Sequence, residues 1–334
     1  MEYRKLISFG KNSFVVSLPK SWIRQNKMQK GDLIHIADSG SDLILSKKES
    51  EEKKLEKTKV ILVDGKPLTQ IEKEINSAYI LNYRTIILKG EEVRGNIRTF
   101  QNFFQNLIAL EVMEQTPTTL VAKDFLHMDK VSADELIRKM DIVTRTMLKE
   151  SCTNFSEENY KGINERDKDV NRLYFLLYRS VLFNLDNPLR AITNFKLNSI
   201  DLVNILFSGY YLEGMADEVR RTARYCRLLE INAEKKKEVE DLLARTNTYY
   251  LETMRAFYGR NVKKALELSA MKKDLNEKLD VLEQDNRSVM YYSSAVSRMR
   301  RMISFIHNLG RNVYQGYNYF DISGDPEGLL QEKQ

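Results

Sequence analysis

Three kinds of hydrophobic pattern follow one another along the 334 residues of the chain. The first part contains short apolar runs separated by turn residues, which predicts short β-strands, at 6–9, 14–18, 33–36 and 43–45. From residue 59 to about residue 125, short apolar runs alternate with amphipathic segments, as in small α/β domains. After Ser132 the spacing of apolar residues is that of helices. The pattern therefore predicts a β-rich head, a small α/β domain and a long helical region.

The head, residues 1–48, is small and basic. Residues 19–24 (PKSWIR) predict a short helix between the second and third apolar runs. Fewer than fifty residues of short strands bury little core alone, so we expect the head to need a partner copy. The head carries nine basic and four acidic residues, a net charge of +5 out of +6 for the whole chain. Most surface charges are simply solvated, but the scarcity of acids before Asp32 favours binding to nucleic acid.

Composition narrows the class of protein further. The chain is 42% apolar and 30% charged, with a mean hydropathy of −0.46, and no apolar run approaches the length of a membrane span. The first residues lack the apolar core of a signal peptide. We therefore expect a cytoplasmic protein with no membrane insertion. Cys152 and Cys226 are too few for a disulfide framework or a cysteine-rich metal site.

The order of motifs in the head is specific. A Gly10-Lys11 turn joins two strands, the second strand ends in Leu18-Pro19, a short helix contains Arg24, and Lys30-Gly31-Asp32 precedes the next strand. This order resembles the AbrB/SpoVT family of DNA-binding domains. The resemblance implies that two copies interleave their hairpins into one swapped-hairpin β-barrel, that the protein is a homodimer through this head, and that it binds double-stranded DNA. At the positions that match the DNA-contacting residues of the family, this sequence has Arg4, Lys5, Lys11, Lys20 and Arg24, so the resemblance implies that these residues bind DNA.

The basic residues favour backbone contacts over base readout. Members of the family often have two adjacent arginines in the short helix, whereas Ile23 precedes Arg24 here. Arginine suits bidentate contact with guanine, and lysine mainly binds phosphates. We expect tight, salt-sensitive binding with modest sequence preference.

Residues 49–58 form a charged linker, and residues 59–130 predict a small α/β sandwich of βαβαββ order. Its strands are expected near 60–63, 85–88, 111–114 and 120–122, with helices at 67–81 and 91–107. No glycine-rich nucleotide loop follows either early strand, so the domain is interpreted as an interface or spacer.

The remaining chain predicts tandem three-helix bundles at 131–230 and 231–315, followed by a tail at 316–334. The six amphipathic segments lie at about 134–153, 157–184, 189–229, 234–258, 261–284 and 287–313. The fold class is thus a multi-domain α+β chain that is mostly helical.

Two pairs of carboxylates lie on helix faces expected to be buried. Glu213 and Asp217 continue one apolar stripe, and Glu165 and Asp169 are assigned to another. A buried carboxylate is costly unless it is paired or bound to a cation. Together the four residues could supply oxygens to a metal. The alternative is ion pairing with Arg166, Arg220 or Arg221.

The helical region is similar to the PhoU family of tandem three-helix bundles. Leu212-Glu213-Gly214-Met215-Ala216-Asp217 matches the family's Leu-Glu-Arg-Ile-x-Asp signature with Gly214 in place of arginine, and residues 187–190 (NPLR) match the entry to the same helix. In the last helix Arg300 and Ser304 stand where the acids would be. The resemblance implies a role tied to phosphate uptake. It also implies that a divalent or iron-type metal ion is either confined to the first half or lost altogether.

Jointly, the two resemblances imply a non-enzymatic transcriptional regulator of phosphate uptake. The alternative is an adaptor that controls a phosphate-transporter ATPase or signalling protein, with the head serving only for dimerisation. A metal-dependent enzyme is a weaker alternative, because no histidine or nucleophile lies near the acids.

Overall fold

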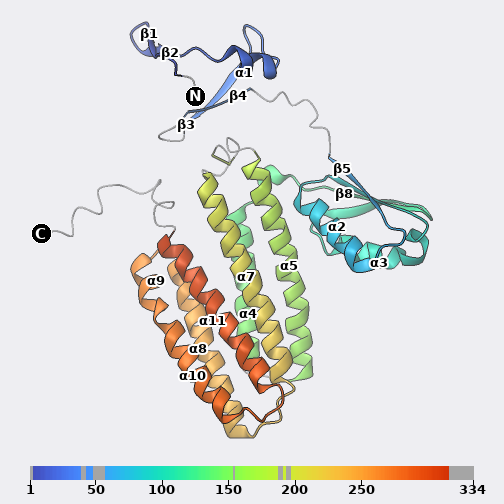
Figure 1. Ribbon diagram of the computed structural model, residues 1–334, viewed down its shortest axis with the longest axis vertical. Coiled ribbons are helices and arrows are strands. Elements are labelled where there is room, and N and C mark those ends of the chain that lie inside the picture. The colour runs from blue at the N-terminus through green and yellow to red at the C-terminus, as the bar shows by residue number, and fades with distance from the viewer. Residues whose placement is uncertain are drawn as a thin grey trace, which may run out of the picture. The chain divides into compact units, whose positions relative to one another are not determined.

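The computed structural model describes residues 3–38, 43–47, 57–152, 155–186, 191–192 and 197–315. The chain divides into two compact units, Met1–Leu55 and Glu56–Gln334. The first unit is the head, and the second contains the α/β sandwich and the helices (Figure 1).

The head consists of two antiparallel hairpins. Strands β1 (Ile7–Phe9) and β2 (Ser13–Val15) form one two-stranded sheet, and β3 (Ile34–Asp38) and β4 (Leu43–Lys47) form the other. The short helix α1 (Lys20–Gln25) lies between them in sequence. Gly10 starts the first turn with a φ of +70°, a conformation that glycine adopts without strain.

The described part of the head has almost no core of its own. Met28 is its one buried hydrophobic residue there. Large apolar side chains of both hairpins are more than half exposed, among them Ile7, Phe9, Phe14, Ile36 and Leu43. The two hairpins of one chain belong to separate sheets and do not form a barrel. The interleaved barrel of two copies stays a prediction.

The sandwich has the expected βαβαββ order. Its elements are β5 (Thr58–Leu62), α2 (Leu68–Ile80), β6 (Thr85–Lys89), α3 (Val93–Gln105), β7 (Leu110–Gln115) and β8 (Thr119–Asp124). The sheet order is β5-β6-β8-β7, with β5 and β6 parallel and β8 antiparallel to both of its neighbours. Both crossovers run in the same direction across the sheet, so right-handed connections place α2 and α3 on one face (Figure 1).

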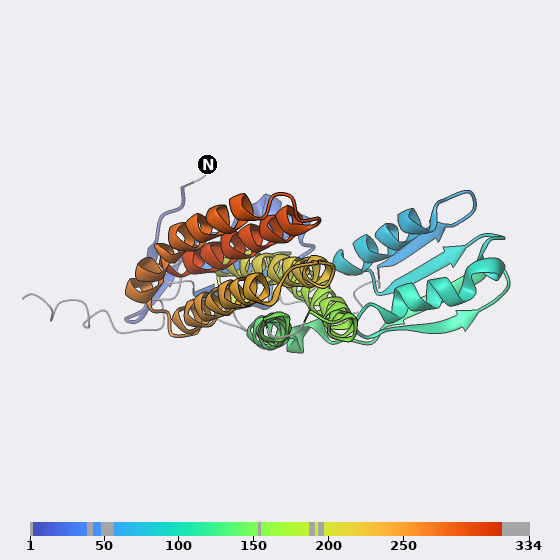
Figure 2. The same ribbon diagram turned by 90° about the horizontal axis from the view of Figure 1, so that it is seen from below.

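The helical region contains α4 (Ala133–Ser151), α5 (Glu157–Leu185), α7 (Ser199–Cys226), α8 (Ala233–Tyr258), α9 (Val262–Ser269), α10 (Met271–Asp285) and α11 (Tyr292–Gln315). Helices α4, α5 and α7 pack on one another, and α11 packs on α7, α8, α9 and α10 (Figures 1 and 2). The predicted helix at 261–284 is two helices, which meet at Ala270. The predicted entry to the third helix, residues 187–190, lies outside the described residues, and α7 begins at Ser199.

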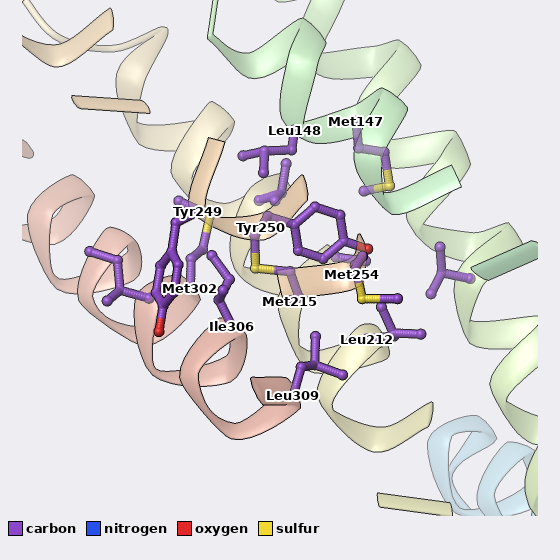
Figure 3. Packing of buried hydrophobic residues seen from close by; sticks show 14 of the residues in the cluster. Met147, Leu148, Leu212, Met215, Tyr249, Tyr250, Met254, Met302, Ile306 and Leu309 are labelled. Atoms are coloured by element: carbon purple, nitrogen blue, oxygen red, sulfur yellow. The ribbon is translucent and has the colours of Figure 1, made fainter. Parts of the chain in front are cut away.

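The two halves of the helical region share one hydrophobic core. Met147 and Leu148 of α4 and Leu212 and Met215 of α7 lie beside Tyr250 of α8 (Figure 3), and α11 adds further residues to the same cluster. Glycines on α7 allow close approach of its neighbours. A Cβ on Gly209 would collide with Leu177 of α5, and a Cβ on Gly214 would lie 2.5 Å from the ring of Phe305 on α11.

A buried cluster of ion pairs connects the sandwich to α5. Arg179 of α5 is fully buried and donates to Asp124 at 2.6 Å, and Arg84 binds the same carboxylate oxygen at 2.7 Å. Arg179 also donates to the side chain of Asn82 at 3.1 Å and lies 4.5 Å from the ring centre of Tyr79. The sandwich and the helices are therefore joined by a desolvated charge network as well as by apolar contact.

Candidate nucleic-acid interface and acidic cluster

The predicted DNA-binding residues are presented at the surface of the head. Arg4, Lys5, Lys11, Lys20 and Arg24 are all exposed. Lys11 lies in the turn between β1 and β2. Lys20 and Arg24 are four residues apart on α1 and so project from the same side of that helix.

Four of these five bases are available to an anionic ligand. Within the described ranges of the chain, no ion pair involves Lys5, Lys11, Lys20 or Arg24. Uncompensated cations on a small module provide the electrostatic attraction that phosphate backbones require.

The bundle contains an acidic cluster where α5 meets α7. It comprises Asp167 of α5 and Glu213 and Asp217 of α7. Arg220 connects the two helices, because its Nε lies 2.9 Å from Asp167 Oδ2 and its Nη2 lies 2.5 Å from Asp217 Oδ1. Arg221 binds the second Asp217 oxygen at 2.8 Å. Asp167 is buried, and its Oδ1 has no hydrogen-bond partner among the described residues.

Glu213 is the member of the cluster whose charge is least compensated. Its pKa is raised to about 7, mainly by burial and then by the nearby Asp217 and Asp167 carboxylates, whose effect exceeds the lowering by Arg221 and Arg220. Burial, followed by the charge of Glu213, raises the pKa of Tyr174 to about 12. Glu213 therefore takes up a proton in the physiological range.

The other two predicted metal ligands lie elsewhere. The side chain of Glu165 is 67% exposed and pairs with Lys168, and that of Asp169 is 58% exposed and lies 3.7 Å from Arg172. The expectation that these acids face the neighbouring helix is wrong. The buried stripe of α5 passes through Ile163, Asp167 and Val170, so Asp167 is the acid that meets α7.

The arrangement of acids does not fit a metal ion. In the part of the chain that the structure describes, no group of three or more His, Cys, Asp or Glu side chains is placed to hold one. Arg220 and Arg221 already neutralise Asp217, which is the task that a cation would perform. Metal binding at Glu213 and Asp217 stays a prediction without geometric support.

A second buried acid was missed by the sequence analysis. Glu218 is almost fully buried, and guanidinium nitrogens of three arginines approach it: Arg301 at 2.9 Å, Arg298 at 3.6 Å and Arg221 at 3.8 Å. The three arginines within residues 298–301 of the last helix could have indicated a buried acidic partner on a neighbouring helix. Arg300, in contrast, faces α10, where it binds Asp280 at 2.6 Å and Glu283 at 2.7 Å.

The fold and these clusters place the protein in a class defined by its long helical region. The first half of that region is a three-helix unit with charged residues buried between α5 and α7. Residues 137–226 match the PhoU domain. This match spans most of α4 and all of α5 and α7, and it indicates a role in the regulation of phosphate homeostasis. No curated protein and no solved structure matches the chain. Among the described helices, none combines the length and apolar character needed to cross a membrane.

Proposed function

We propose that this protein is a cytoplasmic, DNA-binding transcriptional regulator of phosphate uptake, dimeric through its head. The observation that carries the proposal is the composition of the head surface. Lys5, Lys11, Lys20 and Arg24 take part in no ion pair among the described residues, while the apolar residues of both hairpins lie uncovered. A second head would bury the apolar residues and would bring two sets of cations onto one DNA duplex.

The helical region supports the sensory part of the proposal. The PhoU match associates residues 137–226 with phosphate homeostasis. In the proposed mechanism, a ligand or partner protein that prefers one arrangement of the helical region alters the availability of the paired heads for DNA. Such coupling requires different affinities in the two arrangements.

The test is a fluorescence-anisotropy titration of duplex DNA with the full chain at several salt concentrations. Lys11→Glu and Arg24→Glu should each weaken binding strongly and should lower the magnitude of the salt slope by about 2, because each dimer loses two phosphate contacts worth about 0.9 each. Lys139→Glu is the matched control, since it makes the same charge change at an exposed position on α4.

Two outcomes would contradict the proposal. Equal effects of Lys11→Glu and Lys139→Glu would assign binding to overall charge, and absence of binding by the unaltered chain would remove the DNA-binding function. The second outcome would favour the adaptor alternative, in which the chain controls a phosphate-transporter ATPase. The confinement of the PhoU match to the helical region is the observation that supports this alternative.

A further inference from the structure

One face of the sandwich sheet is covered by neither α2 nor α3, and its edge strand β5 is exposed there. The side chains that point to α2 and α3 belong to the buried cluster of the sandwich, among them Ile61, Leu88 and Ala122. Strand residues alternate between faces, so the neighbours of these residues point to the opposite side. There Val60 is 51% exposed and Leu62 is 62% exposed.

The strand register places an apolar row across this open face. Val60 of β5 pairs with Ile87 of β6, and Ile87 pairs with Val121 of β8. The β7 position opposite Val121 is Glu114, at a bulge that adds the half-exposed Met113. Exposure falls along this row, because Val60 is 51% exposed, Ile87 is partly buried and Val121 on the inner strand β8 is 8% exposed, although none of the three belongs to the buried clusters of the protein.

Rows that contain charged residues flank the apolar row, and the charges of the whole face balance. One row pairs Leu62 with Lys89 and Lys89 with Thr119. The other pairs Thr85 with Lys123 and Lys123 with Glu111. With Glu114, the face contains two bases and two acids, so it attracts neither DNA nor a strongly acidic partner. An apolar centre with a charge-balanced polar rim is typical of a protein–protein interface.

We propose that this open sheet face is a homotypic interface, on which the sandwich of a second copy docks face to face. A neutral, self-complementary patch suits a two-fold symmetric pair, because each copy presents the same surface. Four strands of about five residues give a flat area of roughly 300 Å². This lies below the roughly 800 Å² per partner of a standard interface, so the face pairs weakly by itself.

The head supplies the missing affinity. Residues 48–56 separate β4 from the described start of the sandwich, and nine residues reach at most about 30 Å. The linkers of two paired heads would therefore add at most about 60 Å to the separation of the two sandwiches, which corresponds to an effective concentration in the millimolar range. This step, although not the face itself, rests on the proposed pairing of the heads.

The experiment is cysteine crosslinking of the full chain without DNA. The native Cys152 and Cys226 are buried and do not compete for reagent. Leu62→Cys places a thiol on the open face. The control, Arg98→Cys, places a thiol on the exposed side of α3, in the same domain and therefore behind the same linker. With a short bis-maleimide, Leu62→Cys should form covalent dimers at least about ten-fold faster than Arg98→Cys. Adding Val60→Glu should reduce the Leu62→Cys rate to that of the control, while far-UV circular dichroism shows an unchanged fold.

Equal rates for Leu62→Cys and Arg98→Cys would overturn the interface, as would an unchanged rate after Val60→Glu. DNA titration of the same samples separates this inference from the proposed function. Crosslinking without DNA binding would leave the interface standing and refute DNA binding, whereas DNA binding without preferential crosslinking would refute the interface alone.

Discussion

The cluster formed by Arg179, Asp124 and Arg84 allows a ranking of two substitutions. Asp124→Asn leaves two arginines without their counterion, and one of these, Arg179, is fully buried. Removing one partner from a buried ion pair costs about 3–5 kcal/mol. Arg179→Met leaves Asp124 paired with Arg84, and it removes a hydrogen bond to Asn82 and the contact with Tyr79. These losses amount to about 1–3 kcal/mol. Asp124→Asn should therefore destabilise the protein more than Arg179→Met.

The measurement is urea unfolding followed by far-UV circular dichroism, which reports mainly on the helical region. The single tryptophan, Trp22, lies in the head, so its fluorescence follows the first unit separately and should keep its midpoint in both variants. Lys149→Met is the matched control for Arg179→Met, because Lys149 is exposed, and it should change stability by less than about 0.5 kcal/mol. The reasoning fails if Asp124→Asn costs less than about 1 kcal/mol, or if Arg179→Met is the more damaging change.

Two further predictions concern α7. Gly214→Ala should destabilise the protein by about 1–3 kcal/mol, because the new methyl group would displace the ring of Phe305. In the control Gly95→Ala on α3, the new methyl group meets no atom within 4 Å, so this variant should be slightly more stable. Equal shifts of the thermal unfolding midpoint in the two variants would contradict this packing. The pKa of Glu213 is raised from an ordinary 4.5 to about 7, so the free energy of unfolding should fall as pH rises from about 4.5 to about 7. Glu213→Gln should remove up to about 3 kcal/mol of this dependence in urea unfolding at a series of pH values, and an unchanged pH profile would refute the shift.

Periodicity in the sequence predicted the elements well, but it did not determine the phase of α5. Two apolar stripes are available on that helix, one through Leu173 and Leu176 and one through Val170 and Leu177. Leu176 and Leu177 are both buried, so hydrophobicity alone does not distinguish the stripes. The first stripe assigned Glu165 and Asp169 to the interface, whereas the structure places Asp167 there. The choice depends on how α4 and α7 together cover α5, which is a tertiary property.

The remaining omissions have physical causes of the same kind. Arg179 and Asp124 are 55 residues apart, and no local pattern connects them, although a single arginine within the apolar segment 173–183 was a usable signal. The break between α9 and α10 at Ala270 has neither proline nor glycine to mark it. The turn residues of the head, in contrast, act locally, and the hairpin at Gly10 was predicted correctly.

The nearly coreless head has a consequence for how occupancy of a DNA site would depend on the amount of protein. If the hairpins acquire their core only from a second chain, ordering of the head, association of two chains and binding to DNA are steps of one linked equilibrium. The concentration of ordered dimeric heads then rises with the square of the chain concentration while unpaired chains predominate. A modest change in synthesis would produce a larger change in promoter occupancy, and DNA itself would act as a ligand that orders the head.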